Sequence, residues 1–430
     1  MANHQMLIQN NLTKSMRIAQ SAEDLKDFAE LIHNQSKFEL QPIKLCSQKD
    51  WIVHDNCLSH KSGGFFSLCG YRDHNTDFEA LVLFQPQGAF NGMAMYCQDE
   101  KIYLLLQARV EPGNSRVVQY GPTVQSTPAN YLRLHGGKKT AYLEFFFEYC
   151  AGVKVIENST QLDLGERYYQ KTKILSYVQL EEMCPCAENM IWVPLEVVAQ
   201  TIAYDNFLNT DLRSMLGVFD WDSIVREAST ATLPSNLTLP IKHQSQSGSL
   251  VSLKELSKWQ LSDDGIDAIA DIPTSVKLFS VTCTNREVAH WIQPLFLCEG
   301  IGLVVLYQRI KNAQHEFLVR IGQEFGVSRG NVYLPSELVY PGEQETVALS
   351  PGEVLIDLIQ SEEGGRFMQN ENRYQLIQVD ENIEIDDDHI WLSVTEFKTL
   401  LATSNMVSIQ LRCIASFLLP TLNPLLWDKK

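Results

Sequence analysis

The sequence predicts an α+β protein built from two similar halves. Three observations carry this prediction: an internal repeat, a polar segment between its two copies, and the same order of strand-like and helix-like segments in each copy. The 430 residues leave room for two domains of about 200 residues, each long enough to bury a core of its own. The 45% apolar and 20% charged content is typical of an ordinary globular protein.

The internal repeat is clearest where residues 104–113 align with residues 317–326. The same register continues without a gap as far as Pro128 and Pro341. Other aligned pairs are Glu111 with Glu324, Gly113 with Gly326, Tyr120 with Tyr333, residues 161–168 with residues 360–367, and Trp192 with Trp391. A repeat this long exceeds the periods of solenoids and propellers, so it indicates a duplicated domain.

The repeat also predicts the domain boundaries. Residues 1–228 form a first repeat with an N-terminal helix, and residues 253–430 form the second. Residues 229–252, rich in Ser, Thr, Pro, Gln and Asn, are predicted to be the linker.

Both halves show the same sequence of predicted elements. Residues 21–33 have an apolar face and begin after Ser21, a residue suited to cap a helix. Strands rich in β-branched and aromatic residues are predicted at 65–68, 80–84, 102–108, 153–156, 276–283, 288–297, 302–310, 316–321, 354–359 and 374–379. Further helices are predicted at 140–149, 194–202 and 394–401. Strands mixed with flanking helices favour an α+β or α/β sandwich in each half.

Charge and hydropathy exclude several classes of partner. A net charge of −17 argues against nucleic-acid and anionic-membrane binding, because both need a basic surface. A local pocket with one or two arginines can still hold a small anion. No stretch approaches the roughly 20 apolar residues of a membrane helix, and residues 1–20 lack the apolar core of a secretory signal. We therefore expect a cytoplasmic protein.

The ten cysteines are predicted to be free thiols. They are scattered along the chain, and several lie in apolar strands. The close pair Cys184 and Cys186 lacks the second pair, or the histidines, that a zinc site needs.

Three groups of residues resemble the signatures of the NDP-hexose 2,3-dehydratases. They are residues 107–114, residues 121–131, and residues 360–367 followed by 371–374. The resemblance extends to His60 with residues 63–67, to residues 209–214 and to residues 291–294. Three long motifs in the same order make a specific match.

The resemblance implies a duplicated fold, each half similar to a Nudix hydrolase domain, usually assembled as a homodimer. It implies elimination of water across C2 and C3 of a nucleotide-linked 4-keto-6-deoxyhexose, commonly the dTDP-glucose derivative. The product would be a 3,4-diketo-2,6-dideoxy sugar nucleotide, on which a ketoreductase or an aminotransferase acts next. Neither copy contains the paired glutamates that hold magnesium in Nudix hydrolases, so we expect no metal and no cofactor.

The chemistry of the reaction suggests roles for the motif residues. The C4 ketone makes the C3 proton acidic, so the protein must supply a base, a proton donor and a clamp for the diphosphate. Glu362 and Glu363 are the favoured bases, because the neighbouring glycines allow close backbone approach to a ligand, and Glu111 is the next candidate. Tyr131 and Tyr374 are candidate donors. Candidate substrate-binding residues are Arg109, Arg366 and Arg373 for the phosphates, and Gln107, Asn114, Thr123, Gln125, Asn130, Trp291, Gln293, Gln360, Ser361, Gly364, Gly365, Phe367 and Asn372.

The two copies have lost different parts of these motifs. The first copy has Leu162 and Leu164 where the second has Ser361 and Glu363, and the second has Arg320, Gly322 and Leu338 where the first has Gln107, Arg109 and Gln125. In one interpretation a single site combines residues 109–131 of one half with residues 360–374 of the other, within a chain or across a dimer interface. In another, the second copy alone is catalytic and Arg320 clamps the anion. Two alternatives to this activity stay open: a sugar-nucleotide binder without catalysis, and a dehydratase for a different nucleotide sugar.

Overall fold

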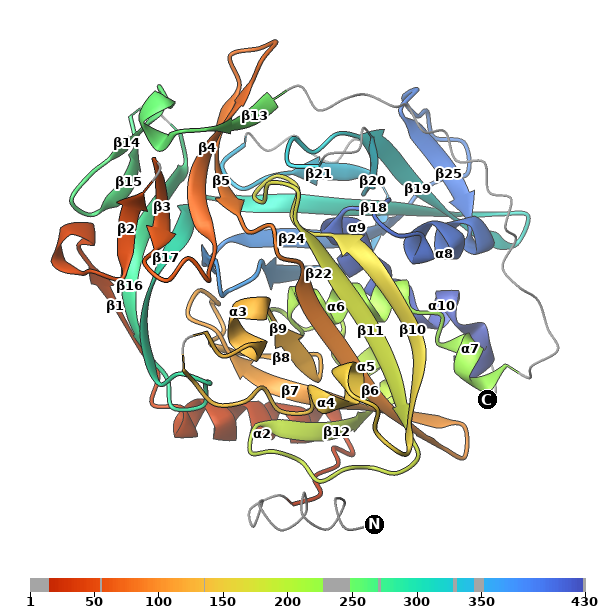
Figure 1. The fold of residues 1–430 in the computed structure, drawn as a ribbon. Coiled ribbons are helices and arrows are strands. Elements are labelled where there is room, and N and C mark those ends of the chain that lie inside the picture. Colours follow the sequence, from red (N-terminus) through yellow and green to blue (C-terminus); the bar gives the residue numbers. More distant parts are fainter. Residues whose placement is uncertain are drawn as a thin grey trace.

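The computed structural model describes residues 15–54, 56–134, 136–226, 248–269, 272–327, 331–343 and 352–427. These residues form a mixed α+β fold of four sheets and mostly short helices (Figure 1). Most of the predicted linker lies outside the described residues, and its last residues belong to strand β13 (Gly248–Val251).

The first large sheet belongs to the first half of the chain. Its strand order is β10 (Val153–Leu162), β11 (Thr172–Leu180), β6 (Ala89–Gln98), β7 (Lys101–Val110) and β12 (Met190–Pro194). The short strands β8 (Val118–Gly121) and β9 (Val124–Ser126) pair with β7 and β6. The pair β11–β6 is parallel and the other pairs are antiparallel.

The second large sheet has the same pairing pattern. Its strand order is β22 (Glu353–Ser361), β24 (Glu371–Gln378), β18 (Ile301–Lys311), β19 (Gln314–Gly322) and β25 (His389–Ser393), with β20 (Val332–Leu334) on β19 and β21 (Glu337–Val339) on β18. The parallel pair, β18–β24, occupies the same place as β11–β6. Each strand falls where the aligned segments of the repeat place it.

Two smaller sheets join the halves by exchanging a strand. One contains β2 (Trp51–His54), β3 (Cys57–His60), β4 (Ser67–Asp73), β5 (Glu79–Phe84) and β13. The other contains β14 (Trp259–Leu261), β15 (Gly265–Ala268), β16 (Thr274–Thr282), β17 (His290–Cys298), β23 (Phe367–Met368) and β1 (Glu39–Ile43). A strand near the start of each half pairs with the other half, β1 with β16 and β13 with β4 (Figure 1).

Helix α2 (Ala22–Gln35) confirms the prediction for residues 21–33. The Ser21 hydroxyl accepts a hydrogen bond from the Asp24 amide at 3.2 Å, and the Asp24 carboxylate accepts one from the Ser21 amide at 3.1 Å. This reciprocal cap satisfies two amides that the first helical turn leaves unpaired.

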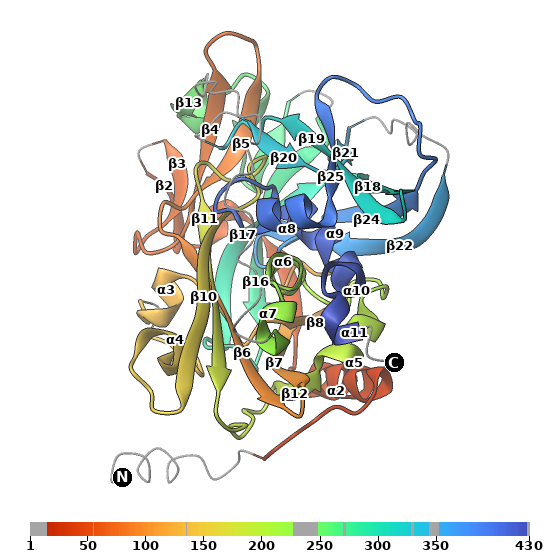
Figure 2. The ribbon, with the colours of Figure 1, turned by 90° about the vertical axis from the view of Figure 1, so that its right-hand side faces the viewer.

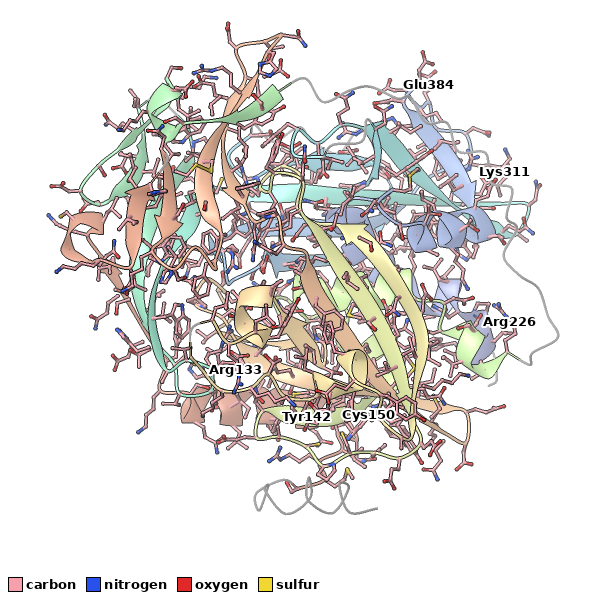
Figure 3. All side chains as sticks on the ribbon, in the orientation of Figure 1. Arg133, Tyr142, Cys150, Arg226, Lys311 and Glu384 are labelled. Carbon is pink, nitrogen blue, oxygen red and sulfur yellow. A yellow bond between two sulfur atoms is a disulfide. The ribbon has the colours of Figure 1, made fainter. Side chains whose placement is uncertain are left out.

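The remaining helices are short. They are α3 (Pro128–Tyr131), α4 (Glu144–Phe147), α5 (Leu195–Thr201), α6 (Thr210–Val218), α7 (Asp222–Val225), α8 (Val394–Ala402), α9 (Ile409–Ala415), α10 (Leu419–Leu422) and α11 (Pro424–Trp427), with 3₁₀ turns η1 (Leu45–Ser47), η2 (Leu253–Glu255) and η3 (Ser416–Leu418). The predicted helix at 140–149 is wrong except for α4. Tyr142, labelled in Figure 3, has a φ of 62°, which a continuous helix excludes, and its hydroxyl binds the Ala187 amide at 2.6 Å.

Helices α6 and α9 pack against each other between the two large sheets (Figure 2). They approach closely because Gly217 lacks a side chain: a Cβ there would lie 2.2 Å from the carbonyl oxygen of Arg412. Each helix also carries a buried arginine that reaches the other half. Arg213 of α6 donates to the Gln360 side chain at 2.8 Å, and Arg412 of α9 donates to the Leu162 carbonyl. The core is therefore continuous across both halves.

Cys57 and Cys69 form a disulfide between β3 and β4, so the prediction of free thiols is wrong for this pair. The pairing of the two strands brings their Cα atoms to 4.8 Å, inside the range that a disulfide needs. Eight other cysteines are free. Among the described residues, none of the helices has the length and apolar character needed to cross a membrane.

Candidate active site

A cavity of about 380 Å³ lies where the two halves meet. Its volume falls in the range of small-molecule sites. The first half contributes side chains from the large sheet and from the β2–β4 region, and the second half contributes the segments 286–293 and 363–366. We call it the shared cavity.

The two halves come together through a close backbone contact beside this cavity. The Gly113 amide donates to the Gly364 carbonyl at 2.7 Å, and the Gly113 carbonyl accepts from the Gln369 amide at 2.7 Å. A Cβ on Gly113 would lie 1.6 Å from the carbonyl oxygen of Phe367, so only glycine fits. The structure therefore brings residues 109–131 and 360–374 together within one chain.

One wall of the shared cavity carries a buried group of charges, which we call the Lys173 cluster. It consists of Asp163, Lys171, Lys173, Asp211 and Glu363. The Lys173 ammonium lies 2.8 Å from Asp211 Oδ1, 3.3 Å from Asp163 Oδ1 and 3.8 Å from Glu363 Oε2. Lys171 lies on the far side of Asp163, 3.1 Å from its Oδ2. Together with Arg366, the cluster holds three cations and three carboxylates, which offsets the cost of burying each charge.

Neighbouring side chains orient the members of the Lys173 cluster. The Tyr168 hydroxyl donates to Glu363 Oε2 at 2.9 Å, and the Asn91 amide donates to Asp211 Oδ1 at 2.8 Å. Burial opposes the charge of Glu363, but Lys173, Lys171 and Arg366 outweigh it and hold the pKa of this carboxyl well below its usual range. Burial likewise opposes the charge of Lys173, yet the surrounding carboxylates raise its pKa well above the usual value. Both groups are therefore ionised at neutral pH.

A second charged group lies on another wall. Arg109 Nε donates to Glu111 Oε1 at 2.8 Å, and Arg109 Nη1 donates to Gln107 Oε1 at 3.1 Å. Arg286, from the second half, donates to the Val110 carbonyl at 2.8 Å and lies 3.9 Å from Glu111. Burial, and then the nearby Arg109, lowers the pKa of Arg286. Arg286 Nε also lies 3.5 Å from Glu287 Oε2, so two guanidinium groups and two carboxylates meet on this wall, and the guanidinium groups can bind an anion.

Aromatic side chains line another part of the cavity. They are Trp51, His60, Phe65, Phe66 and Trp291. The rings of Trp51 and Phe66 lie 4.9 Å apart, and the guanidinium of Arg366 lies 4.3 Å from the Phe66 ring centre. An aromatic ring beside a cation is suited to a nucleobase and its phosphates.

The structure places some of the sequence-predicted residues in the cavity lining and others behind it. Those in the lining are Arg109, Glu111, Gln125, Asn130, Trp291, Gln293, Glu363, Gly365 and Arg366. Gln293 is held by a hydrogen bond from its amide to the Gly365 carbonyl at 3.1 Å and by one that it accepts from Trp291 at 2.8 Å.

Several predicted residues outside the lining pack and form hydrogen bonds behind the cavity. Glu362 is buried and accepts from Asn372 at 2.6 Å, and burial raises its pKa to about 7. Gln360 accepts from Arg213, and Ser361 donates to Asn206 at 2.6 Å. Phe367 and Tyr374 are buried in the core.

The other predicted residues outside the lining have structural contacts as well. Thr123 donates to the Leu105 carbonyl at 2.6 Å, and Gln107 accepts from Arg109. Asn114 packs against Gly364, where an added Cβ would lie 2.0 Å from Asn114 Oδ1. Tyr131 packs against Phe147 at 5.5 Å. Arg373 is half exposed and paired with Asp357.

Sequence reasoning missed Lys171 and Lys173. Two lysines spaced two residues apart, in and just before a strand, were a usable signal, because alternate residues of a strand share a face. The second copy has Asn370 and Asn372 at these positions. The missed residues also include Asn91, Trp51 and Arg286. Asp211, Phe65 and Phe66 lie in segments of the resemblance, but no site role was predicted for them.

The equivalent place in the other half has lost most of these groups. Val304, Gly322, Leu338 and Leu164 stand where the shared cavity has Asn91, Arg109, Gln125 and Glu363. Glu324 remains there, buried, accepting a hydrogen bond from the Tyr340 hydroxyl at 3.2 Å. Burial raises its pKa to about 8. The charges needed for chemistry are therefore concentrated in the shared cavity.

Comparison with known proteins supports a family assignment. A family model described as NDP-hexose 2,3-dehydratase matches residues 22–219, 232–334 and 342–418. A dTDP-4-dehydro-6-deoxy-α-D-glucopyranose 2,3-dehydratase of Streptomyces violaceoruber is 28% identical over 83% of this chain and 87% of its own. Proteins of the same name from Saccharopolyspora spinosa and Amycolatopsis orientalis are 27% and 24% identical, over 84% and 91% of this chain and 83% and 89% of their own. The chain belongs to the NDP-hexose 2,3-dehydratase family, which confirms the resemblance found in its sequence motifs.

Proposed function

We propose that this protein eliminates water across C2 and C3 of dTDP-4-keto-6-deoxyglucose in the shared cavity. The product is the 3,4-diketo-2,6-dideoxy sugar nucleotide. The observation that carries the proposal is an ionised carboxylate, Glu363, with a side chain only 13% exposed, in a cavity that both halves of a chain of this family line. The three relatives named for this reaction support the choice of substrate.

Glu363 is the base in this proposal. Its contacts with Tyr168 and Lys173 engage Oε2, which leaves Oε1 to take the C3 proton. The low pKa keeps Glu363 ionised but makes it a weaker base for the C3 proton. The C4 ketone compensates for this, because it makes the C3–H bond more acidic. Glu362 is the weaker candidate, because it lies behind the lining and already binds Asn372.

The rest of the cavity suits a nucleoside diphosphate. Arg366, Arg109 and Arg286 supply guanidinium groups for the two phosphates. Trp51 and Phe66 supply a surface on which the base stacks. Arg320, the clamp in the alternative that the second copy works alone, lies outside this lining.

We also infer that the two halves arose by duplication of a Nudix-like domain. The matching order of the two large sheets supports this origin. We also propose that the protein is a cytoplasmic homodimer, that it needs no metal or cofactor, and that it passes its product to a ketoreductase or an aminotransferase. The elimination has no net change in oxidation state, so it needs no redox partner.

The test is to incubate the purified protein with dTDP-4-keto-6-deoxyglucose and a trapping ketoreductase, and to follow the sugar nucleotide by mass spectrometry. We expect loss of one water, and we expect Glu363→Gln to lower the rate by about 10²–10⁴-fold. Glu362→Gln is the matched control, because glutamine keeps the bond from Asn372, and it should stay within about tenfold of wild type. No turnover, with a substrate-dependent rise in melting temperature, would indicate a binder instead.

A further inference from the structure

We propose that Lys173 is the catalytic acid that protonates the departing C2 hydroxyl. This inference rests on the proposed function and assigns the second proton transfer that the elimination requires. It starts from a buried ammonium group that lines the shared cavity and faces three carboxylates.

The contacts of Lys173 indicate a role beyond stabilising the fold. An unpaired buried cation is costly, so the protein must compensate it, and Asp211 at 2.8 Å and Asp163 at 3.3 Å do so. Asp163 already has a second cation, because Lys171 lies 3.1 Å from its other oxygen. Lys171 has a fully buried side chain and lies outside the cavity lining. The two lysines therefore have different roles. Lys171 neutralises the charge of the buried Asp163 carboxylate, and Lys173 presents its ammonium to the cavity.

The repeat gives an independent comparison. At the equivalent place in the molecule, the second half has Asn372 for Lys173 and Asn370 for Lys171, and the first half has Leu164 for Glu363. Both lysines and the carboxylate are thus missing together from the place that the repeat relates to the shared cavity. The ammonium and the carboxylate accompany each other, as expected for an acid and a base that serve one reaction.

The proton transfers balance without an added reactant. Glu363 takes the C3 proton, and the C3–H electron pair forms an enolate whose charge lies on the C4 oxygen. The enolate then forms the C2–C3 double bond as the C2–O bond breaks, and the leaving hydroxide takes a proton from Lys173 to become water. The surrounding carboxylates raise the pKa of Lys173, but Glu363 is neutral once it has taken the C3 proton, and an ammonium group is a stronger acid than water, so this transfer is favourable.

The same pair can restore itself after each turnover. Glu363 is left protonated on Oε1 and Lys173 neutral. Glu363 Oε2 lies 3.8 Å from Lys173 Nζ, which is close but beyond direct hydrogen-bond range, so the proton returns from the carboxyl group to the amine by way of a water molecule. The 3-hydroxyl enol loses its hydroxyl proton, gains one at C2 and becomes the 3,4-diketone. C3 is oxidised and C2 is reduced, so no external oxidant or reductant takes part.

The test separates the acid from the base with two readouts on Lys173→Met. The first is exchange of the C3 hydrogen in D₂O, which needs the base alone. The second is the 2-deoxy-2-fluoro analogue of the substrate, because fluoride leaves without a proton. Both are measured at pH 8, because loss of Lys173 raises the pKa of Glu363 and the base must stay ionised in the variant.

We expect Lys173→Met to lose water elimination by about 10²–10⁴-fold while C3 exchange and fluoride release stay within about tenfold of wild type. If a folded Lys173→Met variant lost water elimination, C3 exchange and fluoride release to the same extent, the assignment would be overturned. Lys173 would then act at the C4 oxygen or in packing. Unchanged water elimination would overturn it as well. A folded wild-type protein that leaves the substrate unchanged would contradict the proposed function instead.

Lys171→Met is the matched control. It removes the same charge from the same cluster but from a side chain outside the lining. Lys171→Met should lower the melting temperature and slow elimination from both substrates to the same extent. The ratio of the rates of water and fluoride elimination should therefore stay at the wild-type value. A ratio changed as much as in Lys173→Met would show that the effect comes from the charge of the cluster, and would contradict the assignment.

Discussion

Gly113→Ala tests the contact that joins the two halves beside the shared cavity. The added Cβ would lie 1.6 Å from the carbonyl oxygen of Phe367, and this backbone atom cannot rotate away as a side chain could. The two segments must separate, which breaks both 2.7 Å hydrogen bonds at Gly113. A broken bond that leaves one of its two groups buried and unpaired costs about 1–3 kcal/mol, so two such bonds correspond to about 2–6 kcal/mol of stability.

The same substitution should also lower activity, because the displaced segment carries Glu363 and Arg366. A shift of about 1 Å in a reacting group lowers the rate by about 10²-fold. The assays are thermal unfolding and kcat/KM on the trapped reaction. Gly88→Ala is the control: a Cβ there would lie at an ordinary 3.5 Å from the Thr172 carbonyl, and stability should change little. A Gly113→Ala protein with wild-type melting temperature and kcat/KM would refute the reasoning.

Three further predictions concern charge, binding and thiols. Burial raises the pKa of Glu324 to about 8, against about 4.3 unfolded, so its contribution to stability is complete below about pH 4.3 and is lost as the pH rises through 8. Glu324→Gln should therefore raise the melting temperature over wild type at pH 9 but not at pH 4, and equal curves would contradict the burial argument. Arg366→Met removes a guanidinium that we assign to the phosphates, so KM should rise more than kcat falls, by about 2 kcal/mol or 30-fold, and an unchanged KM would contradict that role. Thiol titration of the unfolded, unreduced protein should give eight thiols, rising to ten after reduction, whereas ten before reduction would contradict the Cys57–Cys69 disulfide.

The sequence predicted elements whose signals are local. The cap at Ser21 and the apolar face of α2 depend on residues a few positions apart, and both are present. The strands follow the register of the repeat because each copy has the same alternation of residues. The helix expected at 140–149 failed because Tyr142 binds the Ala187 amide and Pro185 carbonyl, and these contacts hold the backbone in a left-handed conformation.

Contacts between the halves were harder to predict, because no local pattern specifies them. The exchange of β1 and β13 pairs strands that are more than 170 residues apart, Gly70 with Val251 for example. The neighbours Glu362 and Glu363 could not be separated from sequence, yet one lies behind the cavity lining and the other in it. Lys173 escaped notice because its partners Asp211 and Glu363 are distant in the chain and meet it only after folding.

The central claim is that one site needs both halves of the chain, and Arg109→Met compared with Arg320→Met tests it most directly. Arg109 comes from the first half and lines the shared cavity, whereas Arg320 lies outside that lining and would clamp the anion if the second half worked alone. Dehydration of dTDP-4-keto-6-deoxyglucose should fall by at least about 30-fold in Arg109→Met, and stay near wild type in Arg320→Met. The reverse result, full activity without Arg109 and loss without Arg320, would contradict the account.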